Sequence, residues 1–500
     1  MKENFDIGLV CMMNYNLGNN LTNYALYCYL KDKGYRVGLI DIPYEGIYFK
    51  RIREKGPTLF FGEKPYADNE ILLANDKWEL YEKAENYHAY IVGSDQLWRD
   101  DFVANTDYFT MLNWVPTYKY KFSYATSIGK NSYNIKERDD YYTGFLLSRF
   151  NQISVRESSA KMLLWEKWKI NSELVMDPVF MCDVSHYDEL ARRGMQRILT
   201  ERYTAMYFLD VTKTKEAAGL KVANLATNGK YMAMTEIIYD KVSSDEIVYT
   251  VQPYVEEWIA MIRNSEFVIT DSFHGMCLAI IYKKPFLVFF NKDNERGYSR
   301  FKDLLLTLNL SNRLIDDFEK IDIDEKSYYQ IDYNEVYKII DNIKSESMKW
   351  LNMVLHEMDS YEGRDDTYTC YLRSEYLRHN EEEKRARIFI AQAKKLRCIS
   401  LKTELNEPQI VGWGAGNYFY KKADELVKKC NMKYVCDRNP DLWGKELVEG
   451  VKCISPQDLF QMDNVLVIII AENIFFIEEI KKELHYMGID RFECVDDFLM

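Results

Sequence analysis

A histidine at the start of a predicted helix is the residue of this sequence best placed to do chemistry. It belongs to the stretch Phe267-Val-Ile-Thr-Asp-Ser-Phe-His-Gly-Met276. The first four residues are typical of a short buried strand, and Asp271 and Ser272 can then cap a helix whose buried face runs over residues 276–281. His274 is therefore predicted in the first turn, beside free N–H groups and the positive end of the helix dipole. That position favours phosphate binding and proton transfer near neutral pH; the alternative is a histidine that only closes a loop.

Two arginines could supply positive charge to the same anion. Arg156 follows a short predicted strand, where a guanidinium suits two-pronged binding of phosphate or carboxylate. The alternative for Arg156 is a salt bridge to Glu157 or another acid. Arg300 begins a predicted helix after a loop that we expect to lie near the histidine. The alternative for Arg300, and for Arg296 in the same loop, is a solvated surface position.

A parallel sheet is the predicted scaffold for these side chains. Residues 5–10 form a predicted strand, residues 18–20 a glycine turn, residues 21–33 a helix that Gly34 ends, and residues 35–40 the next strand. This strand–helix–strand order predicts parallel pairing of the two strands. Ligands of such open sheets bind at the carboxyl ends of the strands, which is where the glycine turn falls.

Polar residues follow three further predicted strands in the first half of the chain. These strands cover residues 89–92, 122–125 and 153–155. Any one strand end is typical of ordinary turn chemistry, but together they fall at one edge of a parallel sheet, which predicts a ligand-binding rim. The residues that we predict to bind substrate are Asn19, Ser94, Asp95, Ser127, Asp271, Ser272 and Arg300.

The predicted elements divide the chain into four parts. Around Asp177-Pro178 the chain crosses into a second α/β half, which has a strand at residues 205–209 and a helix that Thr212 caps and Gly219 ends. Residues 332–397 are charged and helical in pattern. We therefore predict domains over residues 1–182, 183–345 and 405–500, and a charged helical linker over residues 346–404.

The last part of the chain opens on a glycine-rich turn. The sequence Gly412-Trp-Gly-Ala-Gly-Asn417 lies between a predicted strand and a helix, and a second strand ends at Asp437. This is close to the dinucleotide-binding fingerprint, although the third glycine of the fingerprint is displaced. We predict a small Rossmann-like domain that binds a nucleotide or nucleotide sugar; the alternative is a scaffold with no ligand. Its predicted binding residues are Gly412, Gly414, Gly416 and Asp437.

Composition excludes several classes of function. With 65 basic and 78 acidic residues the net charge is −13, which argues against a general nucleic-acid binder. The ten cysteines show no CxxC pair, so the sequence predicts neither a zinc site nor a disulfide framework, and we assign no metal ligand. Cys11, Cys28 and Cys277 have apolar neighbours and are predicted core residues. The N-terminal residues lack the apolar centre of a signal peptide, which predicts a cytoplasmic protein, with contact to the inner membrane face compatible.

Six motifs in a fixed order resemble the polysaccharide pyruvyl transferase family over about residues 5–315. No single motif is specific, but the ordered set is. The resemblance implies a GT-B-like pair of Rossmann-type α/β domains with parallel sheets and a cleft between them. The motifs are Gly18-Asn-Asn, Val92-Gly-Ser-Asp-Gln-Leu-Trp98, Tyr124-Ala-Thr-Ser-Ile-Gly129, Ile153-Ser-Val-Arg-Glu157, Asp177-Pro178 and Asp271-Ser-Phe-His-Gly275.

The resemblance also implies an activity. Members transfer a pyruvyl group from phosphoenolpyruvate to two hydroxyls of a sugar, forming a cyclic ketal, and need no further cofactor. The acceptors are sugars of cell-surface polysaccharides such as capsule and exopolysaccharide, often carried on a lipid diphosphate or nucleotide. The family's important arginine and histidine correspond to Arg156 and His274, and a third basic residue to Arg300. Two alternatives stay open: a glycosyltransferase that uses a nucleotide sugar, and a non-catalytic subunit that binds one.

Overall fold

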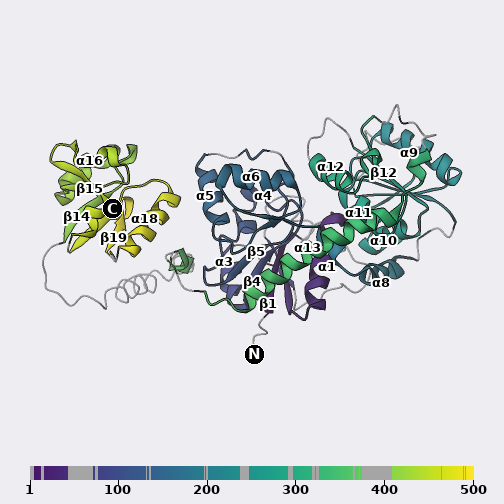
Figure 1. Cartoon of the computed structure of the whole chain (residues 1–500), viewed down its shortest axis with the longest axis horizontal. Helices are drawn as coiled ribbons and strands as arrows, with labels where there is room; N and C mark the ends of the chain where they lie inside the picture. The colour runs from purple at the N-terminus through teal and green to yellow at the C-terminus, as the bar shows by residue number, and fades with distance from the viewer. Residues whose placement is uncertain are drawn as a thin grey trace. The chain divides into compact units, whose positions relative to one another are not determined.

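The computed structural model resolves the chain into two compact units (Figure 1). The first comprises Met1–Val115, Lys119–Ile135 and Leu146–Gly363, and the second comprises Pro116–Tyr118, Lys136–Phe145 and Arg364–Met500. The structure describes residues 5–12, 16–42, 71–73, 77–130, 132–134, 137–195, 198, 201–236, 247–290, 297–317, 321, 326–363, 366, 368–370, 372–373, 408–462, 464–487, 489 and 491–499. Arg296 and residues 374–397 of the predicted charged helical stretch lie outside these residues.

The N-terminal half of the first unit is built on a five-stranded sheet in the order β3-β2-β1-β4-β5, with every pairing parallel. Its strands are near-continuous apolar runs because helices cover both faces. A short pair, β6 (Ser154–Val155) and β7 (Glu173–Leu174), continues the sheet through a bridge between Thr126 and Val155. The strands are β1 (Phe5–Cys11), β2 (Val37–Asp41), β3 (Ile71–Leu73), β4 (Tyr87–Val92) and β5 (Tyr120–Ser123).

The C-terminal half of the first unit repeats this plan. Its six strands are all parallel, in the order β10-β9-β8-β11-β12-β13. Both halves thus place the first strand at the centre of a Rossmann-type order, and the unit is a GT-B-like pair. The strands are β8 (Thr204–Phe208), β9 (Tyr231–Thr235), β10 (Tyr249–Val251), β11 (Phe267–Thr270), β12 (Phe286–Phe289) and β13 (Leu314–Ile315).

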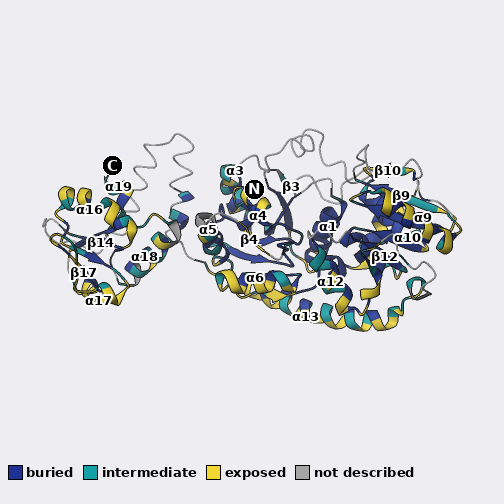
Figure 2. Ribbon diagram, turned by 90° about the horizontal axis from the view of Figure 1, so that it is seen from above, coloured by how far each residue is buried: buried dark blue, intermediate teal, exposed yellow. Residues whose placement is uncertain are grey.

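Helices of the first unit pack around these sheets, so that buried strands lie inside and exposed residues lie on the outer helix faces (Figure 2). One apolar core includes residues of α1, α7, α10, α11 and α13 and of both sheets. The helices are α1 (Leu17–Asp32), α3 (Lys77–Lys83), α4 (Asp100–Asn105), α6 (Ser158–Trp168), α7 (Pro178–Met181), α8 (Val184–Gly194), α9 (Lys213–Thr227), α10 (Val255–Asn264), α11 (Phe273–Ile281), α12 (Tyr298–Thr307) and α13 (Tyr333–Asp359), whereas most of α5 (Glu137–Leu147) belongs to the second unit.

Helix α13 ties the two halves of the first unit together. Near its start, Tyr337 donates a hydrogen bond to the carbonyl of Ile281 in the C-terminal half. Near its end, Glu357 accepts one from Tyr120 of β5. The predicted boundary between residues 345 and 346 falls inside this helix, and the first unit extends to Gly363. Although many residues of α13 are charged, the helix also has an apolar face that packs on the unit, and this face includes the buried Leu351.

Two sequence predictions about local structure are wrong. Residues 18–20 do not form a turn, because Asn16 caps α1 by accepting from the N–H of Asn19, and the helix begins at Leu17. Helix α9 does not end at Gly219 but continues to Thr227, where Asn228 in the left-handed conformation ends it. Gly219 lies inside the helix, where an added Cβ would meet Met206 at 3.3 Å.

The second unit contains a six-stranded sheet in the order β16-β17-β15-β14-β18-β19, in which only the β16–β17 pair is antiparallel. The strands are β14 (Gln409–Trp413), β15 (Tyr434–Cys436), β16 (Glu446–Val448), β17 (Val451–Ile454), β18 (Val465–Ile469) and β19 (Phe492–Cys494). The helices are α16 (Asn417–Cys430), α17 (Pro456–Phe460), α18 (Ile474–Tyr486) and α19 (Val495–Leu499). Two apolar clusters cover the two faces of the sheet, as in other Rossmann-like domains.

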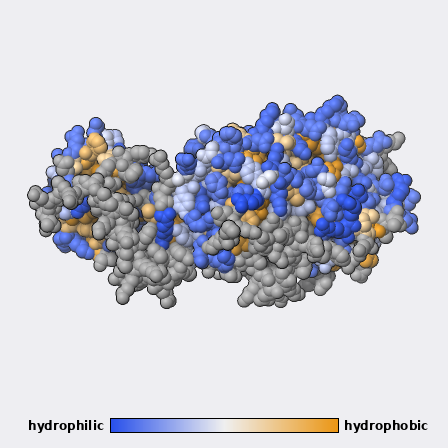
Figure 3. Space-filling view, turned by 90° about the horizontal axis from the view of Figure 1, so that it is seen from below, coloured by the Kyte–Doolittle hydropathy of each residue, from blue (hydrophilic) through white to orange (hydrophobic). Residues whose placement is uncertain are grey.

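The described surface in the view of Figure 3 is mostly hydrophilic, and apolar side chains occur there in small separate groups. Among the described residues, no helix combines the length and apolar composition needed to cross a membrane.

Candidate functional site

A cavity of about 460 Å³ lies in the first unit at the carboxyl edge of both sheets. Its walls include residues that follow β1, β4, β8, β9 and β11, so the cavity occupies the position where open α/β sheets bind ligands. Seven of the residues that line it matter most for chemistry. They are Asn19, Asp95, Lys215, Glu236, Asp271, His274 and Arg300.

His274 lies in the first turn of α11, as the sequence predicts. Ser272 caps this helix, its Oγ accepting from the N–H of Gly275 at 3.3 Å. The imidazole is buried, with Nε2 3.7 Å from Asp177 Oδ2. Its other nitrogen faces α1, where a Cβ on Gly18 would lie 2.3 Å from Nδ1. Only glycine at position 18 therefore allows the start of α1 to pack on this ring.

Arg156 is held in a network of ion pairs, which is the alternative that the sequence left open. Its Nη1 donates to Asp177 Oδ2 at 2.6 Å and to Ser94 Oγ at 2.9 Å, and Nη2 donates to Asp95 Oδ1 at 3.1 Å. The side chain is 1% exposed. Burial raises the pKa of Asp177, but Arg156 and His274 outweigh it and hold that pKa below its usual range. Arg156 is thus a fixed positive charge at the base of the site.

Asp95 connects this network to the cavity. Its carboxylate accepts from Arg156 and, at 3.0 Å, from the side-chain amide of Asn19. Burial raises its pKa, while Arg156, His274 and Arg300 lower it below the ordinary value. The backbone at Asp95 has a φ of 85°, a left-handed conformation that is costly for a residue with a Cβ. The predicted residues Asn19 and Asp95 therefore come together on one wall.

Arg300 is a buried cation of the site with an unpartnered nitrogen. Among the described residues it forms an ion pair only with Asp95, whose Oδ1 lies 3.8 Å from Nη1, and its buried Nε has no hydrogen-bond partner there, which is also true of the Nε of Arg156. The guanidinium carbon lies 5.3 Å from the ring centre of Phe273, and that of Arg156 lies 5.2 Å from the same ring. Burial and the charge of Arg156 lower the pKa of Arg300 to about 10. An anion bound beside Arg300 would relieve both effects.

A second cavity of about 400 Å³ lies on the other side of Arg300 and Phe273. Arg156 lines the second cavity and not the first, whereas Arg300 and Phe273 line both. An anion in the first cavity can therefore contact Arg300 directly. The charge of Arg156 acts on it from behind Asp95, which lies between Arg156 and the cavity.

Asp271 has a structural role in this arrangement. Its carboxylate accepts from the N–H groups of Leu209 and Asp210, at 2.6 and 3.0 Å, and from Lys215 Nζ at 2.6 Å. Burial raises the pKa of Asp271, against the charge of Lys215. Lys215 is buried and lines the cavity. The sequence analysis did not identify it as a site residue, because the sequence shows only that it falls in the first turn of a capped helix. Asp271 and Lys215 together fix the loop after β8 against the end of β11.

Glu236 is a cavity residue that the sequence analysis missed. It follows β9 directly, which is the same signal of a polar residue at a strand end that identified the other rim positions. Its Oε1 accepts from the N–H of Leu17 at 2.8 Å and from Tyr207 OH at 2.7 Å. Glu236 thus joins the C-terminal half to the first turn of α1. Burial raises its pKa to about 7, against these hydrogen bonds, so the group titrates near neutrality.

Two predicted serines do not line the first cavity. Ser127 donates to Glu157 Oε1 at 2.7 Å, and the same oxygen accepts from the N–H groups of Ile128 and Gly129. Ser94 lies between Arg156 and Asp177. Both hydroxyls stabilise the loops that carry the charged network.

The glycine turn of the second unit has its own geometry. Gly414 has a φ of 110°, and a Cβ there would lie 2.7 Å from the carbonyl oxygen of Ile470. Gly412 packs under the side chain of Ile470, whereas Gly416 faces open space at the start of α16. Asp437 accepts from the N–H of Ala415 at 2.7 Å, so its carboxylate occupies a donor of the turn. Packing accounts for Gly412 and Gly414, and nucleotide binding by this turn stays a prediction.

Comparisons with known proteins bear on the first unit. The family model described as polysaccharide pyruvyl transferase matches residues 16–293, which is more than half of the 500 residues. No curated protein gives a significant match.

Three solved structures illustrate the similarity at the level of coordinates. UDP-GlcNAc 2-epimerase from Neisseria meningitidis, bound to UDP-GlcNAc, is 11% identical over 70% of this chain and 100% of its own, with a TM-score of 0.42. The wall teichoic acid polymerase TagF is 13% identical over 71% and 89%, at 0.40. UDP-N-acetylglucosamine 2-epimerase from Rickettsia bellii is 12% identical over 71% and 97%, at 0.37. We base the fold on the strand order of the two sheets and not on these scores.

Proposed function

Because the chain belongs to the polysaccharide pyruvyl transferase family, we propose that it transfers the pyruvyl group of phosphoenolpyruvate to two hydroxyls of a sugar, forming a cyclic ketal. The observation that carries the proposal is the juxtaposition, in one cavity, of an imidazole at a helix N-terminus and a buried guanidinium whose Nε has no hydrogen-bond partner among the described residues. The first suits proton transfer, and the second suits a phosphate or carboxylate group.

The anionic donor would bind between Arg300 and the first turn of α11. Arg300 has an Nε without a hydrogen-bond partner among the described residues, and helix N-termini attract anions through their N–H groups and dipole. Phosphoenolpyruvate carries both a phosphate and a carboxylate, so it can use the guanidinium and the helix end together. Direct contact with the terminal nitrogens of Arg156 would require Asp95 or Asp177 to release one of them.

Proton transfer is the part that we assign to His274. A proton is added to the methylene carbon of phosphoenolpyruvate, and the first sugar hydroxyl attacks C2 and loses its proton to a base. Phosphate then leaves C2 with its bonding electrons, and the second hydroxyl attacks the same carbon to close the ketal. One hydroxyl proton replaces the proton that the acid supplied, and the other leaves with phosphate. Positioned acid–base groups typically contribute about 10²–10⁴-fold to such steps.

Asp177 would orient this histidine. Its Oδ2 lies 3.7 Å from His274 Nε2 and accepts a hydrogen bond from Arg156. The same imidazole nitrogen lies 3.5 Å from Arg156 Nη1, so the carboxylate and the guanidinium together fix the position of the ring. Glu236, whose pKa is about 7, lines the same cavity and is a second group that could exchange a proton there.

The acceptor and the second unit complete the proposal. We propose a sugar of a cell-surface polysaccharide precursor as acceptor, carried on a lipid diphosphate or nucleotide, and contact with the inner membrane face follows for a lipid-linked acceptor. For the second unit we propose a nucleotide or nucleotide sugar at Gly416 and the start of α16, where Asp437 would have to release the N–H of Ala415.

Mass spectrometry of candidate acceptors incubated with the full chain and phosphoenolpyruvate tests the proposal. We expect acceptors to gain the mass of a pyruvyl ketal with release of one phosphate each, and His274→Gln to lack both products. Release of a nucleoside mono- or diphosphate from a nucleotide sugar would identify a glycosyltransferase instead. Binding of nucleotide sugars without any transfer, for every acceptor tried, would identify a binding subunit.

A further inference from the structure

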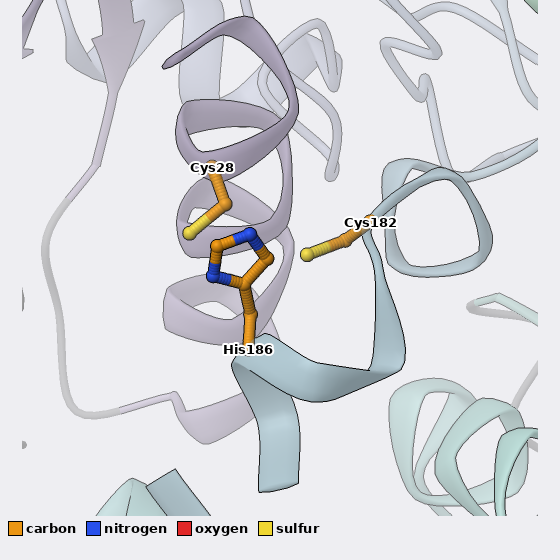
Figure 4. A group of neighbouring side chains, drawn as sticks. All are labelled: Cys28, Cys182 and His186. Carbon is orange, nitrogen blue, oxygen red and sulfur yellow. The ribbon is translucent and has the colours of Figure 1, made fainter. Parts of the chain in front are cut away.

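Two cysteines and a histidine meet in the first unit, away from the cavity described above. Cys28 lies on α1, Cys182 follows α7, and His186 lies on α8. Figure 4 shows the imidazole lying between the two sulfur atoms, with each residue approaching from a different element. One ligand atom of each residue lies within 4.8 Å of those of the other two.

The spacing of these atoms fits a shared tetrahedral metal ion. With metal–sulfur and metal–nitrogen bonds of about 2.3 and 2.0 Å, ligand atoms around one ion stand roughly 3.5–3.8 Å apart. The three atoms therefore need to approach one another by roughly 1 Å at most. Small rotations of the three side chains can supply such a shift without moving the helices.

A carboxylate supports the histidine. Asp32, one turn beyond Cys28 on α1, has its Oδ2 2.9 Å from His186 Nε2. Carboxylates behind metal-binding histidines fix the ring orientation and make the imidazole a stronger ligand.

Burial also suits a bound cation. Cys28 and Cys182 are 6% and 3% exposed, whereas the His186 and Asp32 side chains are 31% and 51% exposed. The sulfurs are thus shielded from water, and the other two residues leave a route from the surface.

We propose that Cys28, Cys182 and His186 form a binding site for Zn²⁺, in which Asp32 orients the histidine. Two thiolates and an imidazole are the ligands that Zn²⁺ prefers, and binding releases the remaining thiol protons. The site joins α1 to the segment that connects α7 with α8. Helix α1 also carries Asn19, and the residue that caps α7 is Asp177, so the ion would brace the two elements that hold the charged network.

The CxxC spacing of common zinc sites is missing because each ligand comes from a separate element, 154 and 4 residues apart along the chain. A disulfide between Cys28 and Cys182 is the competing chemistry for two close thiols. The position of His186 and its carboxylate favours the metal, since a disulfide uses neither.

Metal analysis of the full chain tests the site. The protein is stripped of metal under reducing conditions, equilibrated with Zn²⁺, desalted and analysed by mass spectrometry for bound zinc. We expect one tightly held ion per chain, and with Co²⁺ in its place the absorption bands of a tetrahedral thiolate complex. A fully reduced wild-type chain that retains no Zn²⁺ overturns the proposal, whether or not it forms a disulfide on oxidation.

Variants assign the ion to these residues. His186→Ala removes a partly exposed ligand and is expected to weaken Zn²⁺ by more than the about 10–100-fold that loss of a supporting residue such as Asp32 causes. Cys28→Ser and Cys182→Ser should abolish the cobalt–thiolate band or halve it. Cys430→Ser and the exposed His356→Gln are the matched controls and should retain the ion. Equal zinc content in His186→Ala and wild type would refute the assignment even if the cysteine variants fail to fold.

Discussion

Replacing Glu236 by glutamine is predicted to reduce the pH dependence of the stability of the first unit. Burial raises the pKa of this carboxyl from its ordinary value of 4.5 to about 7. The folded chain therefore binds the proton more tightly than the unfolded chain does. The resulting stabilisation is fully present below about pH 4.5 and is lost as the pH rises through 7.

The magnitude follows from the shift. Each pKa unit corresponds to about 1.36 kcal/mol, so ionisation of Glu236 costs about 1.4 kcal/mol of stability at pH 5.5 and about 3.4 kcal/mol at pH 8.5. Between these two pH values the wild type should lose at most about 2 kcal/mol that the Glu236→Gln variant keeps. The value of about 2 kcal/mol is an upper limit, because the Glu236 side chain faces the cavity, where water can screen its charge.

The comparison needs only the pH dependence and not the absolute stabilities. Glutamine can still accept from Leu17 and Tyr207 through Oε1, but its amide would face the amide of Asn16, and that change is the same at both pH values. Urea unfolding at pH 5.5 and 8.5, followed by hydrogen exchange of peptides from α1 and β8, reports the first unit alone. Glu166→Gln, an exposed position on α6, is the control.

A pH-dependent difference between wild type and Glu236→Gln that stays within about 0.5 kcal/mol would refute the reasoning. A difference of the opposite sign would mean that the hydrogen bonds from Leu17 and Tyr207 outweigh burial.

Further predictions concern the two units. His274→Gln should reduce transfer by about 10²–10⁴-fold with an unchanged melting temperature; turnover within a few-fold of wild type would remove the residue from catalysis. Arg156→Ala should lower the free energy of unfolding by about 3–5 kcal/mol, because it leaves two buried carboxylates without their arginine partner. Arg300→Lys should weaken phosphoenolpyruvate binding in calorimetry and leave the melting temperature within a few degrees of wild type. Gly18→Ala should destabilise by about 1–3 kcal/mol in urea unfolding, since its methyl group overlaps the imidazole. A chain ending at residue 403 should retain transfer to a soluble acceptor. In the full chain, a nucleotide sugar should raise the melting temperature of the second unit, and the size of this rise should differ between wild type and Asp437→Ala.

The strand–helix order of the chain could be predicted because its parallel strands are short apolar runs bounded by clear turn and cap residues. Ser272 and Asp271 mark the start of α11, and the structure has that helix where the sequence predicts it. The start of α1 was missed because the glycine and asparagines that suggest a turn are also compatible with a first helical turn once Asn16 caps it. The length of α9 was missed because Gly219 has a packing role that only the neighbouring strand reveals.

The candidate site was only partly predictable for a different reason. Strand-end positions identify which residues reach the rim, and Asn19, Asp95, His274 and Arg300 do line one cavity. The sequence does not show which polar side chains form hydrogen bonds with each other instead of with a ligand. Ser127 satisfies Glu157 instead of facing the cavity. Such pairings depend on contacts between distant segments, which one sequence does not encode as a local pattern.

The pairing of the two arginines explains how one site can hold a strong charge and still offer a free one. Arg156 has its terminal nitrogens committed to Asp177, Asp95 and a serine hydroxyl, so replacing those contacts with a substrate would break buried ion pairs that cost several kcal/mol to lose. Among the described residues, Arg300 has a distant oxygen of Asp95 as its ion-pair partner, and its charge is disfavoured by burial and by Arg156. An incoming anion therefore gains most at Arg300, where it replaces poor solvation rather than a good ion pair. Arg156 instead holds Asp177 ionised, and this carboxylate lies 3.7 Å from His274 Nε2, where it can orient the imidazole.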